Sequence, residues 1–336
     1  MEESNARKSS QQPRRVRSAP VRYAIEELKF LRSPKAIRNF IGKVMLVFPR
    51  FTGLFNRFYE APPVLQIEPT NHCNADCICC PTSRSSRKRG YMDFDLFRRI
   101  INEASEIGVN AIFLFLHGEP MLHPQIVEMI RYIKSKRLAY HMATNGILFD
   151  ATKIRGILSS GTDNADHISF SMMGATKQVH EKIVRKASYD NVVKNLKMLV
   201  DMREEMRVNG PVIEAIFYAM SENKHEEGKF LRKWQGAIDH VRMSGDISQS
   251  FSEYKRNDSH LTTRTKTCLN LWQKMTIFWN GDVTLCCQDV DGDYVLGNLK
   301  EETINEIWSS STLLTIKTLH KKKQFDKIPL CHRCDM

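Results

Sequence analysis

The stretch TNHCNADCICCP, residues 70–81, places three cysteines in the spacing CxxxCxxC, as Cys73, Cys77 and Cys80. It follows a short β-rich run, and the loop after a strand is where α/β folds carry their chemistry. Three thiolates on one loop suit three corners of a cubane iron-sulfur cluster, which leaves the fourth iron open to another ligand. The stretch therefore predicts a cluster with one reactive iron. Cys79 lies outside the spacing, and we interpret it as a small buried hydrophobe.

The chain around this stretch alternates strand-like and helix-like patterns from Pro63 to about residue 245. Six βα units predict parallel strands joined by right-handed crossovers, and hence an open or closed α/β barrel. Strands are expected at residues 64–67, 111–116, 139–143, 167–171, 212–219 and 238–243. Helices are expected at residues 94–106, 124–136, 153–158, 189–205 and 224–234.

The second expected strand ends in Leu116-His117-Gly118-Glu119-Pro120. Gly118 permits a ligand to approach the backbone closely, and the Glu119 carboxylate suits an ammonium group. Carboxyl ends of parallel strands meet at one edge of a sheet, so this segment is expected beside the cysteine loop. The two motifs together predict a shared site.

A second cysteine set lies near the carboxyl end of the chain and consists of Cys268, Cys286, Cys331 and Cys334. Four thiolates fit either a tetrahedral zinc ion or a fully ligated iron-sulfur cluster, and spacing alone does not separate the two. Either Cys286 or the adjacent Cys287 could supply one of the four thiolate ligands.

Local patterns suggest how these cysteines come together. Residues 277–279 and 283–285 flank Asn280-Gly281, the strongest short hairpin signal. The hairpin would bring Cys286 beside Cys268. A helix at about 304–319 would bring the terminal CxxC, Cys331 and Cys334, back to the same place.

Residues 63 to about 245 resemble the radical S-adenosylmethionine (radical SAM) enzymes, on the CxxxCxxC loop, the GGEP-like motif and the six βα units. The resemblance implies a partial (βα)6 barrel in which Cys73, Cys77 and Cys80 hold a 4Fe-4S cluster. The amino and carboxylate groups of S-adenosylmethionine (SAM) would chelate the fourth iron. The implied SAM contacts are His117 and Gly118 through their backbone, Glu119 and Pro120 near the ammonium, Asn145, Ser171 near the ribose, and Arg185 near the carboxylate.

The sequence departs from the family pattern at three places. Position 79, commonly aromatic or Met, is Cys79; the first Gly of GGEP is His117; and the usual Ser-Leu-Asp-Gly is Ser171-Met172-Met173-Gly174. The third departure removes a carboxylate, so no Asp there is expected to transfer a proton. The proton-accepting catalytic residue is not identified by the sequence.

The order Cys268, GxxxxC and CxxC resembles the shortened SPASM domain called twitch, which holds one auxiliary 4Fe-4S cluster. The GxxxxC register favours Cys286 over Cys287. With all four irons ligated by thiolates, such a cluster suits electron transfer or structural support. The spacing is similar to that of the twitch dehydrogenases of aminocyclitol antibiotic biosynthesis.

The resemblance implies that an external reductant of the flavodoxin or ferredoxin type drives cleavage of SAM to a 5′-deoxyadenosyl radical, which abstracts hydrogen from an unactivated C–H bond. The leading hypothesis is an oxidoreductase that dehydrogenates a sugar, cyclitol or other small metabolite. The alternatives are radical modification of a peptide or protein, and a radical SAM core with a structural zinc domain.

Length and composition set the frame for these hypotheses. The chain of 336 residues is 42% hydrophobic and 26% charged, as expected of a globular protein. We expect a cytoplasmic enzyme, because no apolar run is long enough to span a bilayer and no secretory signal is recognisable. The expected division is a disordered basic arm at 1–20, a basic amphipathic helical extension at 21–60, a core domain at 61–250 and an auxiliary-cluster domain at 251–336.

The amino-terminal part carries most of the net charge of +12, with 13 Lys and Arg against five Asp and Glu in residues 1–60. Residues 21–60 are interpreted as a helical extension packed on the core. The alternative is contact with a membrane surface or a lipid-linked substrate. Nucleic acid is not expected as a partner, because the segment lacks a recognisable binding fold.

Overall fold

The computed structural model describes residues 61–244, 264–332 and 334. The expected arm at 1–20 and extension at 21–60 lie outside these residues, as does the expected boundary between core and auxiliary domains near residue 250. None of the described helices is long and apolar enough to cross a membrane.

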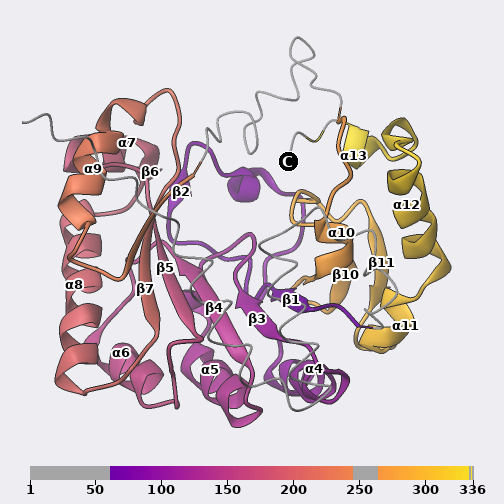
Figure 1. Ribbon diagram of the computed structural model, residues 1–336, viewed down its shortest axis with the longest axis horizontal. Helices are drawn as coiled ribbons and strands as arrows, with labels where there is room; N and C mark the ends of the chain where they lie inside the picture. The colour runs from indigo at the N-terminus through magenta and orange to yellow at the C-terminus, as the bar shows by residue number, and fades with distance from the viewer. Residues whose placement is uncertain (1–60, 245–263, 333, 335–336) are drawn as a thin grey trace, which may run out of the picture. The chain divides into compact units, whose positions relative to one another are not determined.

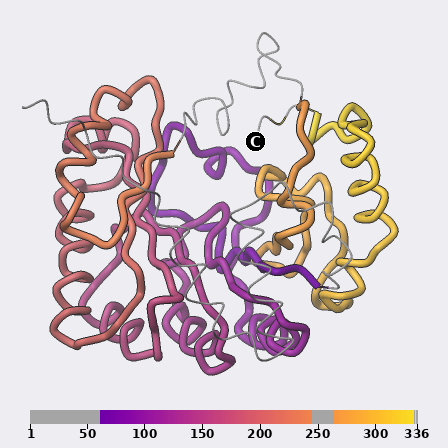
Figure 2. Tube along the Cα trace, in the orientation of Figure 1, coloured from indigo at the N-terminus to yellow at the C-terminus, as the bar shows by residue number. Residues whose placement is uncertain are grey.

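One nine-stranded sheet organises the described chain (Figures 1 and 2). Its strands, with order β11-β10-β9-β1-β3-β4-β5-β7-β8, are β1 (Val64–Ile67), β3 (Ala111–Leu114), β4 (Ala139–Thr144), β5 (His167–Met172), β7 (Val212–Phe217), β8 (His240–Met243), β9 (Lys274–Ile277), β10 (Asp282–Thr284) and β11 (Val295–Asn298). The six strands from β1 to β8 pair in parallel. The prediction of a mostly parallel α/β fold with a radical SAM partial barrel is confirmed.

Helices connect the parallel strands and pack on one side of the sheet (Figure 1). They are α4 (Phe94–Ile107), α5 (Ile126–Ser135), α6 (Ala151–Leu158), α7 (Lys177–Ile183), α8 (Tyr189–Glu205) and α9 (Glu227–Trp234). In α4 the Asp93 side chain caps the first turn by accepting from two amides, and Gly108 ends the helix at φ 83°. Its apolar face, with Phe97 and Ile101 fully buried, lies in the main core. Alternation along each strand then leaves the other face free for polar side chains.

The carboxyl-terminal strands extend this same sheet. β9 pairs in parallel with β1, and the hairpin of β9 and β10 turns at Asn280-Gly281 as predicted, with Val283 opposite Ile277. β11 adds an antiparallel edge. The cysteines of this region therefore stand on a scaffold that is continuous with the barrel.

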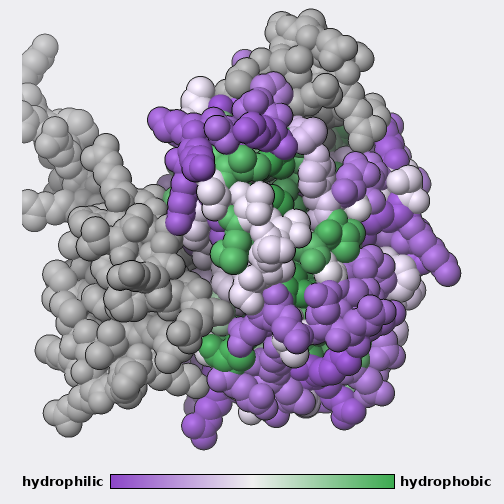
Figure 3. Space-filling view, turned by 90° about the vertical axis from the view of Figure 1, so that its right-hand side faces the viewer, coloured by the Kyte–Doolittle hydropathy of each residue, from purple (hydrophilic) through white to green (hydrophobic). Residues whose placement is uncertain are grey.

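The remaining helices are α10 (Asn270–Gln273), α11 (Ile304–Trp308), α12 (Ser311–Lys321) and α13 (Pro329–His332). The expectation of a single helix at 304–319 is wrong. The Ser310 side chain accepts from the amide of Leu313 and starts a new helix after a break at Ser309. Figure 3 shows the side on which α11 and α12 lie, where hydrophilic side chains predominate over a narrower apolar band.

A two-stranded ribbon of β2 (Asp76–Cys77) and β6 (Val184–Arg185) joins the cysteine loop to the segment after α7. The sequence patterns did not predict either strand or α7. Two-residue strands carry no period that a sequence pattern can reveal.

Candidate active site at the carboxyl ends of the strands

The cysteine loop follows β1 and encloses a cavity of about 230 Å³. The thiol-bearing side chains of Cys73, Cys77 and Cys80 line it together, whereas Cys79 does not. Cys79 packs instead with an apolar cluster that includes Ile183. The structure thus brings the three predicted ligands to one cavity and leaves the extra cysteine against apolar side chains, as interpreted from the sequence.

The thiols of this loop form a donor set that favours a bound cation. Burial, with a smaller contribution from the nearby charges of Glu119 and Cys80, raises the pKa of Cys73 to about 11. Burial and the neighbouring thiols also raise the pKa of Cys77. Three thiolates packed together are unfavourable unless positive charge stabilises them, and iron ligation supplies that charge. The residues present fit an iron-sulfur cluster.

The end of β3 lies directly against this loop. The Glu119 amide donates to the carbonyl oxygen of His72 at 2.8 Å. A Cβ atom on Gly118 would lie 2.1 Å from the carbonyl oxygen of Thr70 and 2.8 Å from the Cα of Asn71. The backbone of the cysteine loop therefore occupies the space that a side chain at position 118 would need, and the assignment of Gly118 to close approach of a ligand stays a prediction.

We therefore expect Gly118→Ala to displace the cysteine loop. Overpacking against backbone should lower the free energy of unfolding by about 1–3 kcal/mol and reduce the iron retained after reconstitution. Gly228→Ala on α9 is the matched control, because its Cβ meets only the flexible end of Arg232 at 3.4 Å. Urea unfolding and iron analysis measure both. Equal stability and iron content in the two variants would show that the loop tolerates the Cβ.

Glu119 is buried and fully hydrogen-bonded. Its carboxylate accepts from the amide of Met121 at 3.1 Å, the hydroxyl of Thr144 at 2.8 Å and the amide of Asn145 at 2.7 Å. Burial raises the pKa of Glu119 to about 7, although these hydrogen bonds oppose the rise. A carboxylate held in this way, beside the cysteine cavity, suits a cationic group of a ligand.

Asn145 links this carboxylate to the cysteine loop. Its side-chain nitrogen donates to Oδ1 of Asn74 at 2.8 Å and lies 3.9 Å from Sγ of Cys73, while its backbone amide binds Glu119. The predicted residue Asn145 therefore bridges the two motifs. Thr144, which ends β4, shares this role through Glu119.

The second cysteine set also converges in the structure. The charges of Cys268 and Cys334 both raise the pKa of Cys331, and those of Cys331 and Cys268 raise that of Cys286. Burial is the largest cause of the raised pKa of both Cys331 and Cys286. For Cys286 the second largest cause is the charge of the neighbouring Cys287. Arg264 donates to Sγ of Cys334 at 3.0 Å. Four mutually interacting thiols with one arginine form a second donor set.

Four thiolates can hold either one metal ion or a cluster of several irons. Within residues 61–244, 264–332 and 334, no three His, Cys, Asp or Glu side chains are gathered closely enough to hold a single metal ion. In a cubane each iron takes one thiolate, so the four sulfurs stand further apart than around one zinc.

Comparison with known families agrees with both sites. The family model described as the Radical SAM superfamily matches residues 67–213, and the SPASM model, described as an iron-sulfur cluster-binding domain, matches residues 268–335. The chain is a radical SAM enzyme with a carboxyl-terminal SPASM domain. Its cofactors are the 4Fe-4S cluster of the radical SAM core, SAM and a SPASM auxiliary cluster. The zinc alternative for the second cysteine set is not supported.

Several characterised proteins are similar to this radical SAM enzyme. The tungsten-containing aldehyde ferredoxin oxidoreductase cofactor-modifying protein of Pyrococcus furiosus is 22% identical, over 81% of this chain and 87% of the relative. The PqqA peptide cyclase of Gluconobacter oxydans is 24% identical, over 76% of this chain and 79% of the relative. BtrN in complex with AdoMet and 2-DOIA has a TM-score of 0.54 at 17% identity, covering 82% of this chain and 93% of BtrN.

The remaining predicted SAM contacts of the enzyme lie at the same edge but make other contacts in this structure. Arg185 pairs with Asp76 of the cysteine loop at 3.0 Å and donates to its carbonyl oxygen. Ser171, at the end of β5, hydrogen-bonds Tyr218. The His117 side chain contacts Arg87 and the carbonyl oxygen of Cys287, in a polar network described below. Their contacts to SAM stay predictions.

Sequence reasoning missed several residues that shape these sites in the enzyme. They are Arg264 beside the auxiliary cysteines, Arg89 and Lys186 in the lining of the first cavity, and the buried pair of Glu68 and Arg87. The run Arg84 to Arg89 is rich in basic residues, but its sequence does not show which of them turn inward.

Proposed function

We propose that this radical SAM enzyme dehydrogenates a hydroxylated small molecule of the sugar or cyclitol class. The observation that carries the proposal is the convergence of Cys268, Cys286, Cys331 and Cys334 around one place. Four thiolates would leave no iron open to a substrate, and such a centre suits the acceptance of an electron. Similarity to BtrN, whose solved complex contains 2-DOIA, supports this choice of substrate class.

In this proposal the cofactors supply the radical and electron chemistry, and the residues of the chain bind SAM and handle the proton. When bound, the clusters and SAM supply a 5′-deoxyadenosyl radical and a one-electron acceptor. Glu119 would hold the SAM ammonium, and Asn145 would keep that carboxylate in register with the cysteine loop. Removal of two hydrogens from an alcohol also requires a group that accepts the hydroxyl proton.

A hydrogen-bonded chain across the sheet is our candidate for this proton path. Nε2 of His141 lies 2.7 Å from Oγ of Ser169, which donates to Oε2 of Glu214 at 2.7 Å. Tyr140 and Met142 belong to the helix-packed core, so His141, between them, faces the other side of the sheet. Since Ser169 donates to Glu214, His141 carries its proton on Nε2 and has Nδ1 available as an acceptor.

Burial lowers the pKa of His141 to about 3, so the ring stays neutral. It would take up a proton at Nδ1 only while Nε2 passes its own through Ser169 to Glu214. The half-exposed Arg242 binds Glu214 at 3.1 Å. A guanidinium does not accept or release a proton, so Glu214 is the last acceptor of this chain.

The test is substrate-dependent turnover of anaerobically reconstituted enzyme with SAM and a one-electron reductant. Aminocyclitols and sugars should yield ketones that have lost two hydrogens, with one 5′-deoxyadenosine formed per ketone. A peptide incubated in parallel should be unchanged. Mass spectrometry that finds no oxidised product from this class while another class is modified would reject the proposal.

A second candidate is radical modification of a peptide. It is favoured by the similarity to the PqqA peptide cyclase and to the mycofactocin maturase MftC of Mycobacterium tuberculosis, which is 29% identical over 45% of this chain. Peptide-dependent formation of 5′-deoxyadenosine, with a mass change on the peptide, would identify this activity. The same assay therefore separates the two candidates.

The proposed role of Glu119 predicts a pH dependence of SAM binding. The ionised carboxylate attracts an ammonium, and with a pKa of about 7 its ionised fraction rises between pH 6 and pH 8. The affinity of the reconstituted enzyme for SAM should therefore tighten about tenfold over this range. Glu119→Gln should weaken binding about 10–100-fold and remove the pH effect.

Anaerobic equilibrium dialysis measures this binding. Glu103→Gln is the control, since the Glu103 carboxylate on α4 accepts from the amide of Ile304, away from the site. A SAM affinity that is the same at pH 6 and pH 8 in the unsubstituted enzyme would contradict the assignment.

As a radical SAM enzyme the protein needs an external reductant, for which we propose a flavodoxin or ferredoxin. Contact of residues 21–60 with an anionic membrane or a lipid-linked substrate is a further proposal, supported by the basic amphipathic pattern alone. Deleting residues 1–60 should then abolish binding to anionic vesicles. Vesicle binding that survives the deletion would end this proposal.

A further inference from the structure

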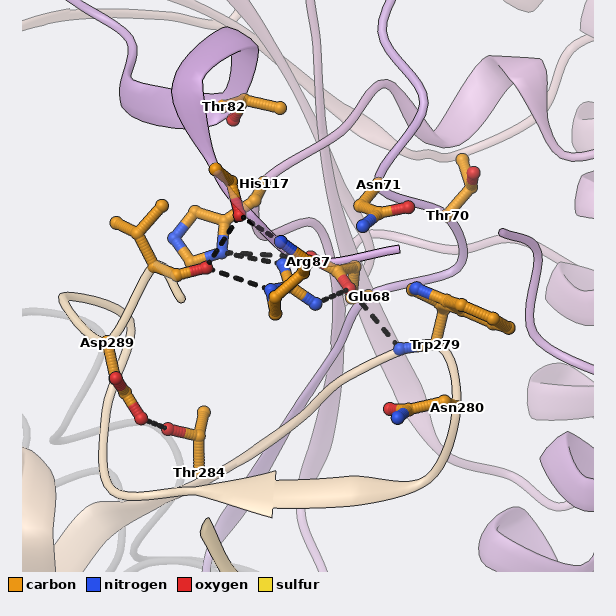
Figure 4. A network of polar contacts seen from close by, with 12 residues as sticks. Glu68, Thr70, Asn71, Thr82, Arg87, His117, Trp279, Asn280, Thr284 and Asp289 are labelled. Atoms are coloured by element: carbon orange, nitrogen blue, oxygen red, sulfur yellow. Dashed lines mark hydrogen bonds and ion pairs between the residues drawn. The ribbon is translucent and has the colours of Figure 1, made fainter. Parts of the chain in front are cut away.

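His117 replaces the first glycine of the family motif, and its side chain is buried, with 5% exposed. It follows β3 and stands two residues before Glu119. Its Nε2 lies 3.0 Å from the carbonyl oxygen of Cys287. Its Nδ1 lies 3.3 Å from Nη2 of Arg87 (Figure 4). The imidazole thus joins the strand end that carries Glu119 to the loop that carries Cys286.

The partners of the ring define its tautomer. A guanidinium only donates hydrogen bonds, so Nδ1 of His117 must accept from Arg87. The proton then sits on Nε2 and is donated to the Cys287 carbonyl. Burial lowers the pKa of His117, which favours this neutral form. All polar atoms of the ring are satisfied in one arrangement.

Arg87 is held in place by a buried carboxylate. Its guanidinium makes two hydrogen bonds to Glu68, at 2.7 and 2.9 Å, and Glu68 has a fully buried side chain. Glu68 also accepts from the amide of Trp279 at 3.3 Å (Figure 4). Arg87 donates from Nε to the carbonyl oxygen of Val290 at 2.8 Å and lies 3.7 Å over the ring of Phe278. The pair therefore joins the end of β1 to both sides of the β9–β10 hairpin.

The loop 286–294 that receives these contacts is ordered by one acidic residue. The buried Asp289 carboxylate accepts from the hydroxyl of Thr284 and from the amides of Asp293 and Tyr294 at 2.9 and 3.0 Å. These bonds hold the loop in one conformation.

Ser85 and Ser86 also bond to this loop, at Val290 and Asp291. His117 attaches it to the strand end that carries Glu119, next in the chain to Cys286.

We infer that Glu68, Arg87 and His117 are positioning residues that fix the loop 286–294 to the strand end carrying Glu119, and so set the placement and environment of the auxiliary cluster relative to the SAM site. None of them touches a reacting atom in this scheme. The inference holds whether the substrate is a small molecule or a peptide.

The test compares three substitutions at His117 in the anaerobically reconstituted full chain. The amide nitrogen of Gln reaches the position of Nε2, so His117→Gln retains the donor to Cys287. His117→Asn places its amide near Nδ1 and loses that donor, and His117→Gly restores the glycine common in the family. The readouts are hydrogen exchange of loop 286–294, and the midpoint potential and electron paramagnetic resonance spectrum of the auxiliary cluster.

We expect His117→Gly and His117→Asn to speed amide exchange in the loop about tenfold or more and to alter the auxiliary-cluster spectrum and potential. His117→Gln should stay close to the unsubstituted enzyme. Arg99→Gln is the control, because Arg99 of α4 also donates to carboxyl-terminal carbonyls, at Leu299 and Lys300, but away from this loop. It should change neither readout.

Two results would overturn the inference. One is unsubstituted behaviour of His117→Gly in both readouts. The other is a His117→Gln variant as altered as His117→Gly, since the Cys287 hydrogen bond would then not be what matters. If His117→Gly fails to hold both clusters, the same measurements on His117→Asn and His117→Gln test the inference. Equal behaviour of these two variants would then overturn it.

Discussion

Replacing Cys73, Cys77 and Cys80 together by alanine should lower the iron content of the reconstituted enzyme from about eight to about four atoms per chain and abolish formation of 5′-deoxyadenosine. The three thiols line one cavity beside Glu119, and their removal leaves no donor for the SAM-binding cluster. The auxiliary set, held on β9, β10 and the carboxyl-terminal helices, should keep its own cluster. Iron and sulfide analysis with a SAM cleavage assay under reductant measures both effects.

Cys79→Ala is the matched control for this triple variant. Cys79 stands next to Cys80 in sequence, but its side chain packs with the apolar cluster around Ile183 and does not line the cavity. The control should therefore hold about eight irons and cleave SAM. Iron loss in Cys79→Ala equal to that in the triple variant would contradict the ligand assignment.

The sequence was sufficient to predict the barrel because each of its elements carries a local signal. The strands are short apolar runs, and α4 shows a capping Asp93, a helical apolar period and a terminating Gly108. The Asn280-Gly281 pair likewise predicted the hairpin of β9 and β10. Such signals act over a few residues and do not depend on what the rest of the chain does.

Contacts across long sequence separations were beyond this reasoning. The pairing of Asp76 with Arg185 and the bond from Arg264 to Cys334 join segments that share no local pattern. The contact of Gly118 with the backbone near Thr70 was missed for the same reason, because the two segments are far apart in the sequence. Cysteine spacing did predict that Cys73, Cys77 and Cys80 come together, since a CxxxCxxC loop is short enough to bring its own thiols to one cavity.

The sequence register favours Cys286 as an auxiliary ligand, and its thiol interacts with those of Cys331 and Cys268. This prediction yields a sharp comparison with the neighbouring Cys287. Cys286→Ala should lower the iron content from about eight to about four while leaving SAM cleavage intact. If the enzyme is a dehydrogenase, oxidation of its substrate should fall below detection, because the reaction loses its electron acceptor. Iron analysis, 5′-deoxyadenosine and oxidised product are measured on the same preparation.

Cys287→Ala is the counterpart in this comparison, because the two residues differ in what the fold does with them. The thiol of Cys286 interacts with those of Cys331 and Cys268, whereas Cys287 contributes its main-chain carbonyl, which accepts from His117. Alanine retains that carbonyl, so the loop should stay attached to the barrel and both clusters should form. The opposite result, iron loss in Cys287→Ala and a full iron content in Cys286→Ala, would make Cys287 the ligand. The auxiliary cluster would then be bound by the same residue whose carbonyl accepts the hydrogen bond from His117.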